Sequence, residues 1–158
     1  MTRVVLAALL AIGACSGRDA EPSGIGPYTF THTTLADVKA GDCQPTKLED
    51  GRTGTWCFAL PPYRIGKRSA DLDLYFLGTG KDARLIEILL SVRGCVEDDL
   101  EQWLRKAMGA PIETRPKRGY WKNSFMWMAA LMPSDPGRCL VHVVPIDEGS
   151  EIERIKLL

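Results

Sequence analysis

The chain has 158 residues, of which 45% are hydrophobic, and this length suits one domain with a substantial buried core. Its 20 basic and 20 acidic side chains balance to a formal net charge of zero. Because there is no basic excess to neutralise phosphates, the composition excludes nucleic acid as an expected partner.

The first residues indicate export. The apolar run Val4–Ile12 is too short to cross a bilayer as a helix and has the length of a signal-peptide core. It leads into Gly13-Ala14-Cys15, and the segment from Ile12 to Cys15 resembles the lipobox of bacterial lipoproteins. The resemblance implies that residues 1–14 are a signal peptide that is removed, and that Cys15 then carries lipid, including palmitate. The alternative is an ordinary secretory signal with an incidental cysteine.

A polar segment rich in glycine and proline follows the proposed lipid site. We predict that residues 15–32 comprise the lipidated cysteine and a flexible tether to the membrane. Ser16 stands where lipoproteins retained in the inner membrane of enteric bacteria tend to have Asp. The resemblance therefore favours the outer membrane, with the protein facing the periplasm.

The cysteine count agrees with lipidation. The chain has five cysteines, and lipid on Cys15 would leave four that could form two disulfides in an oxidising compartment. Four cysteines allow three pairings. The turn signal Glu49-Asp50-Gly51 favours Cys43–Cys57, which leaves Cys95–Cys139 as the second pair. The alternative of a metal site on the four thiols lacks any Cys-x-x-Cys spacing, so no metal is expected.

Helix and strand patterns alternate along the remaining chain. The segment Thr34–Asp37 is similar to a capping box, and Gly41 closes a short first helix. A second helix has an apolar stripe from Val96 to Met108 and ends at Gly109. Alternating apolar residues between turn signals predict six strands, at Gly54–Leu60, Leu72–Leu77, Leu85–Val92, Tyr120–Leu131, Leu140–Val144 and Glu151–Leu157.

Several of these patterns recur at nearly one offset. Residues 72–90 match residues 139–157 at a constant offset of 67. Such a recurrence indicates an internal duplication. We therefore predict an α+β fold of two tandem units, 33–92 and 93–158, each with one helix and a three-stranded antiparallel meander, and with the helices packed on one sheet face. The alternative is two unrelated hairpins that look alike because both alternate.

The order of helix, Gly-x-Trp strand and hairpin resembles two known families. One unit is similar to the outer-membrane assembly lipoproteins of the SmpA/OmlA type, and two units in tandem resemble the beta-lactamase inhibitory protein fold. Both resemblances imply a binding module in which helices cover one sheet face. Because a fold does not by itself give a function, no partner is carried over.

The segment Tyr120–Leu131 is the predicted contact surface. As one strand it would place Tyr120, Lys122, Met126 and Met128 on the face opposite the helices. Tyrosine and methionine are common at adaptable binding surfaces. The alternative is a central strand that is buried on both faces.

The sequence offers little for catalysis. Neither His32 nor His142 has a recognised motif around it, and His142 is better explained as a packed strand residue. We expect no catalytic residue, no cofactor and no enzyme activity. The expected function is a lipid-anchored envelope protein that binds another envelope or periplasmic protein, in envelope assembly or maintenance. The alternatives are an inhibitor or sensor of a soluble periplasmic enzyme or ligand, and a hydrolase.

Overall fold

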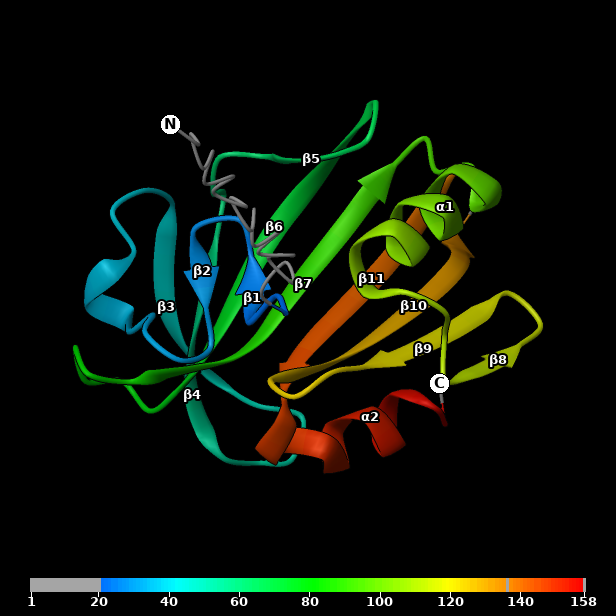
Figure 1. Ribbon diagram of the computed structural model, residues 1–158. Helices are drawn as coiled ribbons and strands as arrows, with labels where there is room; N and C mark the ends of the chain where they lie inside the picture. The colour runs from blue at the N-terminus through cyan, green and yellow to red at the C-terminus, as the bar shows by residue number, and fades with distance from the viewer. Residues whose placement is uncertain (1–20, 136, 158) are drawn as a thin grey trace, which may run out of the picture.

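The computed structural model describes residues 21–135 and 137–157 (Figure 1). The predicted signal peptide and the predicted lipidation site at Cys15 therefore lie outside the described residues. A little under half of the described residues belong to one large antiparallel sheet, which is more strand than the sequence predicted.

The large sheet has nine strands in the order β3-β4-β6-β7-β11-β10-β9-β8, and β5 pairs with β6 off this path. Two meanders therefore meet where β7 pairs with β11. The strands are β3 (Asp42–Lys47), β4 (Thr53–Phe58), β5 (Tyr63–Ile65), β6 (Arg68–Leu77), β7 (Arg84–Arg93), β8 (Glu113–Arg115), β9 (Arg118–Lys122), β10 (Met126–Asp135) and β11 (Arg138–Pro145).

The two faces of this sheet are covered differently. Along β6 and β7, buried side chains alternate with half-buried ones, as expected when one face is packed and the other is more open. The packed inner face holds the main core, where Leu74, Ile88 and Val141 meet Leu100 and Leu104 of helix α1 (Glu97–Met108). The second helix, α2 (Gly149–Ile155), packs on the outer face instead.

The predicted tandem α+β fold is thus wrong. The two α-helices of the described residues lie on opposite sheet faces, and the meanders have four strands each along the sheet order. The offset of 67 would place residues 85–90 of β7 on residues 152–157, yet α2 begins before that segment and occupies most of it. Ile152 and Ile155 are both buried, and their spacing of three residues fits one face of a helix as well as a strand pattern.

The first predicted helix is only one turn long. A 3-10 turn, η1 (Leu35–Asp37), follows Thr34, whose backbone N–H donates to Asp37 Oδ2 at 2.8 Å. The predicted capping contact is therefore present. The turn ends after three residues, and the chain soon enters β3.

Regular structure begins within residues 15–32, which the sequence predicted to be a flexible tether. Strands β1 (Gly24–Ile25) and β2 (Tyr28–Thr29) form a small hairpin. Ile25 belongs to the core, and Tyr28 packs against it. Figure 1 shows this hairpin beside α1, on the same side of the large sheet.

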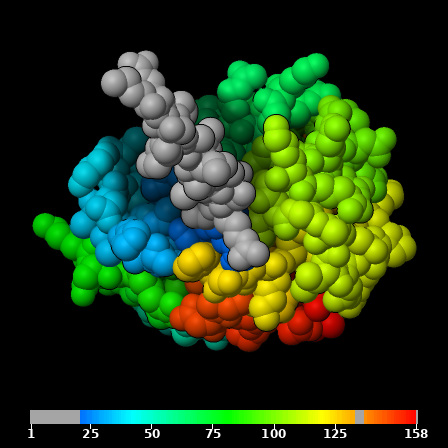
Figure 2. Space-filling model, in the orientation of Figure 1, coloured from blue at the N-terminus to red at the C-terminus, as the bar shows by residue number. Residues whose placement is uncertain are grey.

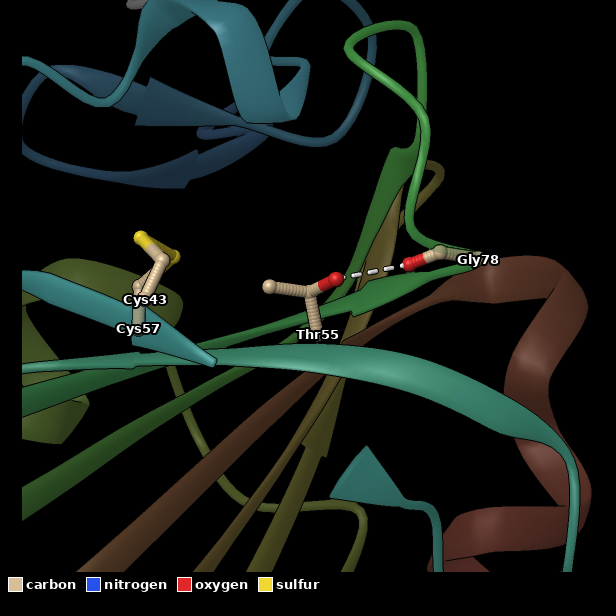
Figure 3. Close-up of a disulfide and its surroundings, with 4 residues drawn as sticks. All are labelled: Cys43, Thr55, Cys57 and Gly78. Atoms are coloured by element: carbon tan, nitrogen blue, oxygen red, sulfur yellow. Dashed lines mark hydrogen bonds between the residues drawn. A yellow bond between two sulfur atoms is a disulfide. The ribbon is translucent and has the colours of Figure 1, made fainter. Parts of the chain in front are cut away.

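Both predicted disulfides are confirmed. Cys43 and Cys57 stand opposite each other on β3 and β4 and are bonded (Figure 3). Cys95, just before α1, is bonded to Cys139 of β11. Close to the first disulfide, Thr55 Oγ1 donates to the Gly78 carbonyl at 2.9 Å, which ties β4 to the turn after β6.

Candidate functional site

The outer sheet face has a part that α2 leaves open. Helix α2 contacts β10 and β11, whereas the outward residues of β4, β6 and β7 stay half-buried. Strand register places these residues in rows, with Trp56 opposite Tyr75 and Asp73 opposite Leu89. We call this surface the acidic–aromatic face, and it comprises Trp56, Phe58, Asp71, Asp73, Tyr75, Glu87, Leu89 and Ser91.

Three aromatic rings form one side of this face. The ring centroids of Trp56 and Phe58 are 4.4 Å apart, and those of Trp56 and Tyr75 are 6.4 Å apart with an interplanar angle of 9°. Burial, followed by the Glu87 carboxylate, raises the pKa of Tyr75 to about 12, so its hydroxyl stays protonated at neutral pH. The rings thus form a neutral, partly exposed platform.

Asp73 lies next to this platform without a positive partner. Burial raises the pKa of Asp73, the Trp56 indole opposes that rise, and the neighbouring Asp71 carboxylate adds to it. No ion pair reaches Asp73 from the described part of the chain, whereas Asp71 pairs with Arg93 at 2.8 Å. A half-buried carboxylate without a counter-charge is costly in the free protein, so a cation supplied from outside would relieve that cost.

A histidine–glutamate pair lies at the edge of the face. His142 Nδ1 is 2.7 Å from Glu87 Oε1, and the imidazole is buried, which confirms His142 as a packed strand residue. Its Nε2 is buried and has no partner within the described residues. A general base needs an accessible nitrogen within reach of a substrate proton, and this buried nitrogen does not meet that condition. His32, the other histidine, is exposed in the N-terminal region.

A cavity of about 140 Å³ adjoins this pair, between the β3–β4 turn and α2. Glu148 closes it from the α2 side and is bound by Arg52 Nη2 at 2.7 Å and by Arg84 Nη2 at 2.5 Å. Glu148 is buried, and both of its carboxylate oxygens accept hydrogen bonds from arginine. The two guanidinium groups therefore balance its charge. These ion pairs hold the β3–β4 turn, β7 and the C-terminal segment together and leave Glu148 without a free oxygen for a ligand.

The predicted contact residues lie elsewhere, and their predicted exposure is wrong. Tyr120, Met126 and Met128 are buried; only Lys122 is exposed, with Nζ 4.3 Å from the centroid of the Trp127 ring. The two methionines pack in the core beneath α1, whereas Tyr120 packs with α2 on the other side.

The segment is a hairpin and not one strand, which explains the error. Asn123 Oδ1 accepts the backbone N–H groups of Phe125 and Met126 at 2.8 and 2.9 Å, and this turn separates β9 from β10. Met128 consequently lies opposite Trp121, so both faces of the hairpin carry large side chains that the rest of the fold covers. The Lys-Asn-Ser sequence at this point is a turn signal that could have located the hairpin.

Comparison with protein-family models, with curated proteins and with solved structures finds no match to this chain. The resemblances to assembly lipoproteins and to the beta-lactamase inhibitory protein thus rest only on the residues that suggested them. Within residues 21–135 and 137–157, no helix is long and apolar enough to cross a membrane, and no cluster of metal-binding side chains is found. The acidic–aromatic face is the candidate site that the geometry favours.

Proposed function

We propose that this protein is a lipid-anchored component of the bacterial cell envelope that acts as a protein-binding module. The apolar leader and the lipobox-like segment ending at Cys15 support the anchor. The open acidic–aromatic face supports the binding role, and it replaces the surface predicted on residues 120–131. A place in envelope assembly or maintenance remains part of this proposal.

The chemistry of the face favours a basic segment of a partner protein. An arginine or lysine side chain can stack on the rings of Trp56 or Phe58 and pair with the carboxylate of Asp73. Arginine fits best, because its planar guanidinium stacks on aromatic rings and can donate two parallel hydrogen bonds to a carboxylate. The single observation that carries the proposal is the half-buried Asp73, which has no positive partner and lies beside partly exposed aromatic rings.

Site-specific photo-crosslinking in a bacterial host that expresses the full chain tests this proposal. A benzophenone amino acid replaces Phe58 on the face, and the matched control places it at Asp98, an exposed position of α1 on the other side of the sheet. We expect a discrete protein adduct from position 58 that position 98 does not give. Asp73→Asn should reduce that adduct several-fold, because it removes the charge but keeps the shape.

An adduct that is unchanged by Asp73→Asn, or that forms equally at position 98, would contradict the proposed face. Cell fractionation then shows whether the crosslinked partner is membrane-bound or soluble. A membrane-bound partner supports an envelope module, and a soluble one supports an inhibitor or sensor of a periplasmic protein.

A further inference from the structure

Two exposed apolar side chains meet at one end of the large sheet. Phe125 belongs to the turn between β9 and β10, and Ile146 begins the 3-10 turn η2 (Ile146–Glu148) directly after β11. The backbone N–H of Ile146 donates to the Phe125 carbonyl at 2.9 Å, so the two residues are held side by side. They are 40% and 38% exposed, and we call this pair the apolar tip.

The N-terminal end of the described chain is fastened to the same place. Asn123 Nδ2 donates to the Pro22 carbonyl at 2.8 Å, and the backbone N–H of Ser124 donates to Glu21 Oε2 at 2.9 Å. These hydrogen bonds from Ser124 lower the pKa of Glu21, as expected for a carboxylate that accepts them. Figure 2 shows the yellow β9–β10 turn bordering the blue N-terminal hairpin, with the orange segment after β11 beneath it.

The length of chain before this attachment limits the distance to the membrane. Glu21 comes six positions after Cys15, and six residue steps span at most about 20 Å even when the chain is fully extended. If Cys15 carries lipid that is inserted in the bilayer, the turn at Ser124 must stay within about that distance of the bilayer surface.

We propose that the apolar tip rests on the lipid bilayer, with Phe125 and Ile146 inserted among the headgroups. This inference rests on the proposed lipid anchor and adds a fixed orientation to it. Aromatic and aliphatic side chains favour the membrane interface, and a neighbouring lysine favours anionic headgroups. Lys122 supplies that charge at the end of β9 and lies over the Trp127 ring.

Acidic groups at the tip do not oppose this contact strongly. Asp147 is paired with Arg84 Nη1 at 2.7 Å, and Glu148 is paired with both Arg84 and Arg52. Glu21 is a further acidic side chain near the tip, and its carboxylate accepts a hydrogen bond from the backbone N–H of Ser124. The acidic groups of η2 therefore reach the bilayer already paired with arginine.

Lipid photo-crosslinking of the full lipidated protein in vesicles of phosphatidylethanolamine and phosphatidylglycerol tests the inference. A benzophenone amino acid replaces Phe125, a change from one aromatic side chain to another. The control position is Val96, which is 45% exposed at the opposite end of β10 and β11, about 25 Å away by the length of β11. We expect phospholipid adducts at position 125 at least fivefold above those at position 96.

The outcomes separate the anchor from the tip. Protein that floats with the vesicles but gives equal lipid adducts at positions 125 and 96 overturns the tip contact and leaves the anchored binding module standing. Protein that does not float with the vesicles overturns the anchor, and the tip contact with it. In a second measurement, the double change Phe125→Ser and Ile146→Ser should leave the melting temperature nearly unchanged. It should weaken the vesicle binding of a chain that starts at Ser16, which has neither the leader nor the lipid, and the binding that remains should be more sensitive to salt. Unchanged vesicle binding counts against the tip.

Discussion

Met126 and Met128 provide a sharp test of how the hairpin of β9 and β10 is packed. Both side chains are fully buried in the core beneath α1. Replacing a buried methionine by a small residue costs about 2–5 kcal/mol, and a serine adds a hydroxyl that has no partner there. Because the two sites are neighbours, their effects will not simply add. We expect the double change Met126→Ser and Met128→Ser to lower the free energy of unfolding by at least about 4 kcal/mol.

That loss is a large share of the roughly 5–15 kcal/mol by which a domain of this kind is stable. Urea unfolding of the disulfide-bonded protein measures this loss, and the melting temperature should fall by more than about 10 °C. Lys122→Ser is the matched control, since it changes an exposed residue of the same hairpin. It removes only the contact of Lys122 with the Trp127 ring and should cost no more than about 1 kcal/mol. A double variant that unfolds with the native midpoint would refute the packing described for this hairpin.

Two further expectations concern the disulfides and Asp73. Replacing Cys95 and Cys139 by alanine opens a loop of 44 residues and should cost about 4 kcal/mol in the chain-entropy model, against about 3 kcal/mol for the 14-residue separation of Cys43 and Cys57. Urea midpoints of the two double variants check this order, and a larger loss for the shorter loop would contradict it. Asp73→Asn should stabilise the protein at pH 7, because the folded-state pKa of this acid is raised and its ionisation in the folded protein is unfavourable. This gain in stability should disappear as the pH falls below 3.8, the ordinary pKa of the aspartate side chain in the unfolded chain. Urea unfolding curves at pH 7 and pH 3 measure it. If Asp73→Asn changes stability equally at both pH values, or destabilises the protein at pH 7, Asp73 is not an unpaired carboxylate.

Local signals in the sequence predicted local contacts well. The turn Glu49-Asp50-Gly51 folds β3 onto β4 and brings Cys43 to Cys57, because a hairpin register follows from its turn. The capping residues Thr34 and Asp37 also meet as predicted. Each of these inferences involves residues close in the chain, whose geometry depends little on the rest of the fold.

The errors arose where local patterns are ambiguous. Ile152 and Ile155 are three residues apart, which a short strand and a helix turn can both accommodate, and the packing of α2 on β10 and β11 decides between them. The acidic–aromatic face was not predicted, for a related reason. Alternation shows that Trp56 and Asp73 point to one side of their strands, but only the position of α2 reveals which part of that side stays open.

The anchor and the binding face impose compatible demands on this sheet. The apolar tip lies at the end where β10 begins and β11 ends, and β7 also begins at that end, because β7 and β11 pair in antiparallel register. Along β6, Tyr75 is consequently nearer the tip, and Asp71 is about 13 Å farther from it by strand length. With the tip on the bilayer, the acidic–aromatic face would stand along the membrane normal, and Asp73 would lie above the headgroups. A basic partner segment could then reach the face from the side without displacing the membrane contact, which is why the two proposals can be tested independently.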